Sequence, residues 1–266
     1  MTSTIVRLAV ALATGLSASG AFAAGLASDT AANYVGVWSA TPANLGSGFD
    51  VWNNQTINGN NPPYVGTYMD QTSYNNSDGV LAGGYAWGTY ANGAPGNGEF
   101  ILSRLFTASG GTASLLNQTF SIGIGSKGLS SGSIGLSIGT AFSLGYAGGG
   151  PDNFTLSVDG GPASVVPVTF AQLNAGLLVA LTVTGPLNST SEGYALSMSP
   201  FAGGAPLYTT SGTFDSSAYN TSSFSFATLN TSADQFANNP TIVLVPEPST
   251  WALLGWGTLL VVRRRK

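Results

Sequence analysis

The fold is decided by residues 118–158, which read QTFSIGIGSKGLSSGSIGLSIGTAFSLGYAGGGPDNFTLSV. In this stretch apolar residues occupy every second position in four runs, and small or turn-forming residues separate the runs. A period of two places all the apolar side chains of a strand on one face, so each run predicts a strand with one buried face. The runs are Phe120/Ile122/Ile124, Ile134/Leu136/Ile138, Phe142/Leu144/Tyr146 and Phe154/Leu156/Val158.

The same alternation continues toward the C-terminus. Residues 179–183, 194–198 and 224–226 repeat it, with Gly, Pro, Asp and Asn between the runs. Earlier in the chain, residues 34–40 and 80–90 are also expected to be strands, and the body shows no helical periodicity. Short strands at this spacing predict an all-β fold, an antiparallel sandwich or barrel.

The body, residues 24–244, is predicted to be one domain and carries little charge. Its only basic residues are Arg104 and Lys127, against ten acidic residues, for a formal net charge of −8. Nucleic acid is excluded as a partner, because phosphate neutralisation needs clustered Lys and Arg. Plentiful aromatic and aliphatic residues argue against disorder. A polar but weakly charged surface therefore predicts an extracellular protein.

Histidine and cysteine are both absent from the chain. This removes the Ser-His-Asp triad, the Cys-His pair, His-ligated or Cys-ligated zinc, and disulfides. Glycosidases need two acids flanking the scissile bond, but no predicted strand carries two acids at neighbouring positions of one face. We therefore predict a protein that is not an enzyme and has no cofactor.

The first twenty-three residues have the pattern of a secretory signal peptide. One basic residue lies in the stretch 1–7, an apolar alanine-rich stretch covers 8–16, and Ala21-Phe22-Ala23 provides small residues for signal peptidase. Cleavage is predicted before Ala24. The alternative, a first membrane helix, is disfavoured by the short apolar stretch.

The C-terminal tail has an apolar run at residues 251–262, preceded by a Pro-Glu-Pro block. Twelve helical residues extend about 18 Å, which is less than the roughly 30 Å of bilayer hydrocarbon, so the tail predicts a short, marginal transmembrane helix. The basic end is expected to stay in the cytoplasm, with the body on the other side of the inner membrane. This basic end comprises Arg263, Arg264, Arg265 and Lys266.

Together these parts resemble the PEP-CTERM sorting signal of Gram-negative bacteria that make exopolysaccharide. The resemblance implies that an exosortase, a membrane-embedded cysteine transpeptidase-like enzyme, recognises and cuts the tail. It also implies transient anchoring in the inner membrane with the body in the periplasm, followed by release to the cell surface or the extracellular matrix. The motif residues are Val245, Pro246, Glu247, Pro248 and Ser249, within a sorting segment that spans residues 245–266.

A second resemblance concerns the body. An Arg-x-Phe strand at 104–106 followed by Gln-Thr-Phe-Ser at 118–121 is similar to PEP-CTERM proteins with a concanavalin-like jelly-roll body, which implies a jelly-roll-like sandwich. Arg104 would share a strand face with Phe100, Leu102 and Phe106. Because a half-buried arginine needs a partner, we expect an ion pair with an Asp distant in sequence.

Three polar residues in predicted turns could offer oxygen ligands to calcium. Asp152 and Asn153 follow a Gly-Gly-Gly-Pro turn, and Asp159 begins another turn. The alternative is that these residues stabilise the turns through hydrogen bonds to their own backbone.

Aromatic residues concentrate in the first third of the body, among Asn, Gln and Gly. Sugars stack on exposed rings and hydrogen-bond to amides, so Trp52, Tyr64 and Trp87 are candidate carbohydrate contacts. Core packing is the alternative for these large rings. The full set is Trp38, Trp52, Tyr64, Tyr68, Tyr74, Tyr85, Trp87 and Tyr90.

Two functions fit these observations. The first is a non-enzymatic, exported protein of the cell envelope or extracellular matrix. The alternative is a carbohydrate-binding, lectin-like module that acts in the exopolysaccharide or biofilm matrix.

Overall fold

The alternating runs form strands in the computed structural model, which describes residues 25–38, 44–57, 65–71, 80, 84–91, 98–107, 115–185, 189–229 and 234–245. The signal peptide, the sorting residues 246–249, the apolar run 251–262 and the basic end 263–266 lie outside these ranges, so their roles stay predictions. Within the described ranges, no helix is long and apolar enough to cross a membrane.

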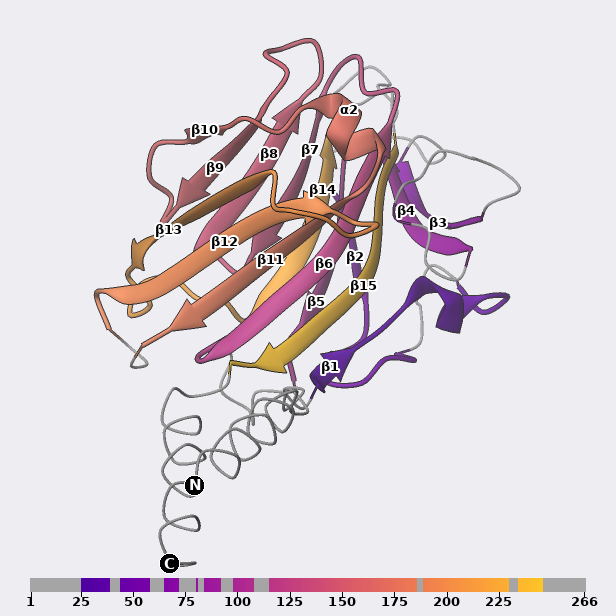
Figure 1. Ribbon diagram of the computed structural model, residues 1–266. Helices are drawn as coiled ribbons and strands as arrows, with labels where there is room; N and C mark the ends of the chain where they lie inside the picture. Colours follow the sequence, from indigo (N-terminus) through magenta and orange to yellow (C-terminus); the bar gives the residue numbers. More distant parts are fainter. Residues whose placement is uncertain are drawn as a thin grey trace, which may run out of the picture. The chain divides into compact units, whose positions relative to one another are not determined.

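One layer of the fold is a seven-stranded antiparallel sheet (Figure 1). Its central strands come from the repeats that follow residue 130 and from the late strand β14, which pairs with β7 on one side and β5 on the other. In spatial order the strands are β10 (Ser164–Val166), β9 (Phe154–Val158), β8 (Phe142–Ala147), β7 (Ser133–Ile138), β14 (Ser223–Leu229), β5 (Glu99–Leu105) and β2 (Asn53–Ile57).

The second layer is organised around the strand β15 (Asp234–Leu244). One edge of β15 pairs with β6 (Gln118–Lys127) along most of its length. The other edge is shared: β1 (Gly25–Ser28) pairs with Thr241–Val243, and β4 (Tyr85–Ala91) pairs with Gln235–Ala237. The hairpin partner of β4, β3 (Val65–Gln71), ends this sheet.

A three-stranded sheet extends this layer beyond β6. It consists of β11 (Leu177–Thr184), β12 (Glu192–Pro200) and β13 (Tyr208–Phe214). A parallel bridge between Leu116 and Val183 and a 2.8 Å hydrogen bond between the hydroxyls of Thr119 and Thr182 join β11 to the β6 region. Two antiparallel layers packed face to face confirm the predicted β-sandwich, whereas the jelly-roll assignment stays a prediction.

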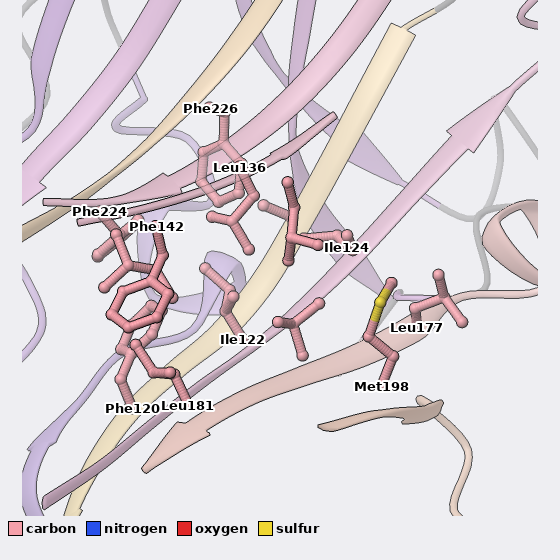
Figure 2. Close-up of a cluster of buried hydrophobic side chains, with 14 of the residues drawn as sticks. Phe120, Ile122, Ile124, Leu136, Phe142, Leu177, Leu181, Met198, Phe224 and Phe226 are labelled. Carbon is pink, nitrogen blue, oxygen red and sulfur yellow. The ribbon is translucent and has the colours of Figure 1, made fainter. Parts of the chain in front are cut away.

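The core lies between the layers, as Figure 2 shows for the side chains of β6, β7, β11 and β14. Alternation is confirmed in the burial of β7, β11 and β14; in β7, for example, Ile134, Leu136 and Ile138 are buried and the residues between them are not. In β6 the alternation stops at Ile122, because residues 122–126 are all buried. Phe120 stacks against Phe224 with ring centroids 5.2 Å apart. Burial of such aromatic rings contributes about 1.5–3 kcal/mol for each, so the alternating runs supply much of the stability.

The pairing of β15 with β6 is interrupted next to one buried side chain, that of Asn238. The register shifts between Asn238 and Thr241, and Asn239 has a left-handed backbone with φ of 51°. Asn238 accepts a hydrogen bond from the Ala31 amide at 3.0 Å and donates one to the Val80 carbonyl at 3.1 Å. Its amide therefore satisfies backbone groups on segments that no strand pairing reaches.

Two local predictions were wrong. Residues 34–38 are not a strand, because a 3-10 helix (Ala31–Tyr34) leads into a turn at residues 35–37. A short helix, α2 (Phe170–Asn174), also appears where no helical periodicity was seen. It is held by a capping box, in which the Thr169 amide donates to Gln172 Oε1 at 2.8 Å and the Thr169 hydroxyl accepts from the Gln172 amide. Five residues are too few for periodicity to reveal.

Candidate functional site

A groove of about 640 Å³ opens beside β2 and β3, the strands that end the two sheets. This volume lies in the usual range for small-molecule sites. Aromatic residues, an amide and hydroxyls line the groove, and none of the described lining residues carries a charge. We call it the β2–β3 groove, and its main side chains are Trp38, Asn54, Thr56, Thr67, Tyr68 and Tyr90.

Two copies of the tripeptide Gly-Thr-Tyr, at 66–68 and 88–90, build one wall of the groove. The antiparallel register of β3 and β4 places Tyr68 opposite Gly88 and Tyr90 opposite Gly66. A Cβ added to Gly88 would lie 2.6 Å from the Tyr68 ring, and one added to Gly66 would lie 2.9 Å from the Tyr90 hydroxyl. Each ring therefore lies over the glycine of the opposite strand, with the ring centroids 6.1 Å apart.

The hydroxyl of Tyr68 donates a hydrogen bond to a carboxylate oxygen of Asp234. Burial, followed by this hydrogen bond, raises the pKa of Tyr68 far above its usual value, so the phenol stays protonated. Burial also raises the pKa of Asp234, while the bond from Tyr68 acts in the opposite direction. The hydroxyl proton of Tyr68 therefore points toward the Asp234 carboxylate.

A second carboxyl, Asp70, lies on β3 two residues beyond Tyr68 and is 1% exposed. Burial raises its pKa, and the negative charge of Asp234 raises it further. The Gln71 backbone N–H and the charge of Lys127 act in the opposite direction. Neither acid lines the groove, and burial disfavours the ionised form of both.

Trp38 contributes the other aromatic wall and rests on a buried cluster of rings. Its centroid lies 5.5 Å from that of Tyr34 and 6.0 Å from that of Trp52, both edge-on. Trp52 packs in turn 4.8 Å from Trp87. The Trp38 indole Nε1 is buried and has no hydrogen-bond partner among the described residues, so Trp38 offers the groove its ring.

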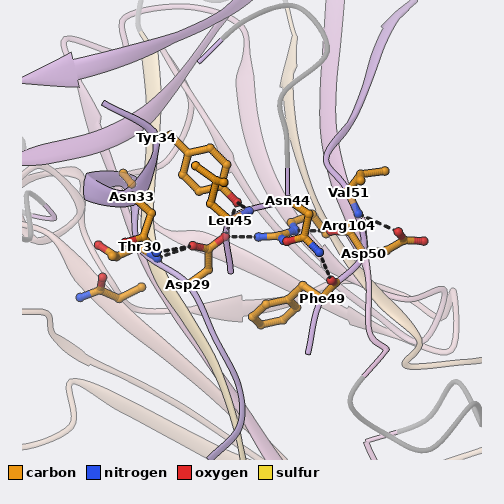
Figure 3. A network of polar contacts seen from close by, with 12 residues as sticks. Asp29, Thr30, Asn33, Tyr34, Asn44, Leu45, Phe49, Asp50, Val51 and Arg104 are labelled. Atoms are coloured by element: carbon orange, nitrogen blue, oxygen red, sulfur yellow. Dashed lines mark hydrogen bonds and ion pairs between the residues drawn. The ribbon is translucent and has the colours of Figure 1, made fainter. Parts of the chain in front are cut away.

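The ring cluster is held in place by the network shown in Figure 3. The Arg104 guanidinium lies 4.7 Å above the Trp52 ring and forms a fully buried ion pair with Asp29. Its Nε donates to the Asp50 carbonyl at 2.8 Å, and the Tyr34 hydroxyl donates to Asp29 at 2.6 Å. The predicted ion pair of Arg104 with an Asp distant in sequence is therefore confirmed.

Two of the three residues predicted to contact sugar are buried in the core instead. Trp52 and Trp87 are 4% and 1% exposed, and their rings pack against other rings, so they offer no face to a ligand. Core packing, the alternative interpretation, applies to both, because Trp87 lies in β4 between β3 and β15. Tyr64 lies outside the described residues. The groove aromatics are instead Trp38, Tyr68 and Tyr90, which belong to the same aromatic-rich region.

The candidate calcium residues stabilise the backbone. Asp152 accepts hydrogen bonds from the Tyr146 hydroxyl at 2.6 Å and the Phe170 amide at 2.5 Å, and these bonds lower its pKa. Asp159 has a left-handed φ of 54° and accepts from the Asp215 amide at 2.8 Å. Asn153 donates its backbone N–H to the Pro151 carbonyl at 2.8 Å, within the turn. In the described part of the chain no three acids are grouped to hold a metal ion.

Comparisons with known proteins give matches at the level of structure alone. No protein-family model and no curated protein sequence matches the chain. A carbohydrate esterase from the Shiga toxin-encoding bacteriophage phi24B is similar with a TM-score of 0.42 and 9% identity, over 73% of this chain and 90% of the esterase.

Binding domains of botulinum neurotoxins are also similar. That of serotype D gives a TM-score of 0.40 and 8% identity over 78% of this chain and 46% of its own. That of the DC type, solved in complex with SialylT, gives 0.36 and 10% over 74% and 47%. This chain therefore spans about half the length of the neurotoxin domains that it matches.

Proposed function

We propose that this protein is an exported, non-enzymatic component of the cell envelope or extracellular matrix, and that it binds polysaccharide in the β2–β3 groove. The observation that carries the binding proposal is the chemistry of the groove. The rings of Trp38, Tyr68 and Tyr90 line the groove together with an amide and two threonine hydroxyls. Flat apolar rings stack on the C–H faces of sugars, and the polar groups hydrogen-bond to sugar hydroxyls.

Delivery is proposed to follow the two ends of the chain. Signal peptidase would release the body before Ala24 during export. The tail would hold the body transiently at the inner membrane until exosortase cuts near Pro246–Pro248. Intact-mass measurement of the secreted protein tests both steps, because the mature form should begin at Ala24 and lack Arg263–Lys266. Retention of those four basic residues would contradict the sorting proposal.

Binding is tested with a glycan array that compares the secreted protein with Trp38→Ala and Tyr90→Ala variants. Each substitution removes one wall of the groove and should weaken binding at least about tenfold, or about 1.4 kcal/mol. Tyr208→Ala is the matched control, because Tyr208 is also half-buried but lies on β13 in the three-stranded sheet. It should bind as the unmodified protein does.

Trp38 packs on buried rings, so its substitution can also reduce stability. Tyr90→Ala guards against this, and circular dichroism with a thermal melt identifies any unfolded variant. A folded Tyr90→Ala variant that binds polysaccharide at full strength would exclude the groove as the site. Failure of the unmodified protein to bind any glycan would reject the binding function.

A further inference from the structure

We propose that the β2–β3 groove is selective for uncharged glycans and excludes acidic ones such as uronic or sulfated polysaccharides. This inference rests on the proposed binding function and adds the class of ligand. Its first support is the lining itself, in which none of the described residues is charged. An anionic group entering the groove would lose part of its hydration without gaining a cation, which is unfavourable.

The second support is the position of the two cations of the body. The Arg104 side chain is 0% exposed and is neutralised by Asp29, so it cannot reach a ligand. Lys127 lies opposite Asp234 in the register of β6 and β15, and its charge acts on Asp70. Recognition of carboxylate or sulfate normally uses Arg or Lys at hydrogen-bonding distance. Neither body cation is among the described residues that line the groove.

The third support is the direction of the hydrogen bond from Tyr68. Its only proton is donated to Asp234, so the phenol oxygen can accept from a ligand but cannot donate to one. A sugar hydroxyl can donate to this oxygen, whereas a carboxylate or sulfate has no proton to give. Ionised Asp234, which accepts the hydrogen bond from this hydroxyl, would also repel an anion placed against the Tyr68 oxygen.

A neutral polysaccharide meets uncharged hydrogen-bonding groups in the groove. The Tyr68 oxygen accepts a hydrogen bond, and the exposed Thr56 hydroxyl can donate or accept one. Donors and acceptors without net charge match the hydroxyl groups of a neutral polysaccharide.

The test uses the secreted protein with three neutral polysaccharides, namely dextran, hydroxyethylcellulose and galactomannan, each with its carboxymethylated form. Each pair shares a backbone and differs in charge. We expect at least one neutral polymer to bind at least tenfold more tightly than its carboxymethylated form. Binding of that neutral polymer should change less than twofold between 20 and 500 mM NaCl.

An Asp234→Asn variant sharpens the test, because the amide oxygen still accepts from Tyr68 while the charge is removed. The variant should bind the neutral polymer as tightly as the unmodified protein does. The ratio between its affinities for the neutral and carboxymethylated forms should fall severalfold. Equal or tighter binding of the carboxymethylated forms would overturn the selectivity and leave polysaccharide binding intact. Binding to none of the six polymers, and to no glycan of the array, would overturn both proposals.

Discussion

Asp29 and Asp70 are both buried aspartates, 5% and 1% exposed, but their surroundings differ. Asp29 faces the Arg104 guanidinium and accepts hydrogen bonds from Tyr34 and from the Thr30 amide. Asp70 instead lies near a second carboxyl, Asp234, whose charge adds to the effect of burial on its pKa. The ion pair of Asp29 with Arg104 holds the ring cluster in place. The ionisation of Asp70 depends more on its surroundings, because this residue lies near another acid.

The largest expected effect comes from removing the cation of the first site. Arg104→Met should leave Asp29 as an uncompensated buried charge and lower the free energy of unfolding by about 3–5 kcal/mol. Urea denaturation measures the loss. In an Asp29→Asn/Arg104→Met double variant part of the stability should return, because no buried charge is left alone. A loss below about 1 kcal/mol in the single variant would contradict the central role of the pair.

Next in size is a change that forces the tyrosine wall out of place. Gly88→Ala introduces a Cβ 2.6 Å from the Tyr68 ring, so the ring must move and the free energy of unfolding should fall by about 2 kcal/mol. Glycan binding should weaken with it. Gly145→Ala in β8 is the control, since its Cβ would lie 3.4 Å from the Thr155 hydroxyl. If the Gly88→Ala and Gly145→Ala variants have the same stability and bind glycan equally well, the Tyr68 ring does not lie over Gly88 as described.

A smaller effect is expected for Tyr68→Phe, which keeps the ring and removes the hydroxyl. Asp234 loses a hydrogen-bond donor, and the free energy of unfolding should fall by about 1 kcal/mol at neutral pH. The loss should shrink at low pH, where protonated Asp234 needs no donor. Chemical denaturation at two pH values checks this. Tyr90→Phe serves as the control. An equal loss of stability in Tyr90→Phe would show that the hydrogen bond between Tyr68 and Asp234 is not the cause.

The smallest effect concerns the pH dependence of stability. Burial raises the pKa values of Asp70, Glu192 and Asp234, so each carboxyl holds its proton more tightly in the folded protein. Their contribution is complete below the unfolded pKa of about 4 and is lost as pH rises through the folded pKa. Asp70→Asn should therefore reduce the decline in stability above pH 4.

The control for this titration is Asp215→Asn. Hydrogen bonds, first from the Ser217 hydroxyl, lower the pKa of Asp215, so its contribution is lost only as pH falls below about 4. The decline above pH 4.5 should match that of the unmodified protein. Thermal melts from pH 4.5 to 8 compare the three proteins, and an unchanged slope in Asp70→Asn would show that Asp70 titrates normally.

Much of the fold could be predicted from the sequence because strand periodicity is a local signal. The runs around Ile122, Leu136 and Leu144 each show their buried face within a few residues. Arg104 could be predicted to need a distant acid because so few cations are present. The partner itself, Asp29, could not be identified, since 75 residues separate the two.

The groove could not be predicted because it depends on pairings between distant segments. Trp87 is buried because rings from earlier segments, those of Tyr34 and Trp52, pack against it. Trp38, from the turn after the 3-10 helix, and Tyr90, from β4, line the same groove although 52 positions separate them in the sequence. One local signal was present in the repeated Gly-Thr-Tyr, because reciprocal Gly–Tyr pairs fit an antiparallel hairpin.

The position of β15 has a consequence for when the protein can fold. This last described strand lies between β6 on one edge and β1 with β4 on the other, so it completes three pairings at once. Contacts between β1 and β15 join residues more than two hundred positions apart, and such distant contacts form slowly. The second sheet cannot close until residues 234–244 are available. Folding is therefore completed only after almost the whole body has been synthesised, and the second sheet stays incomplete until then.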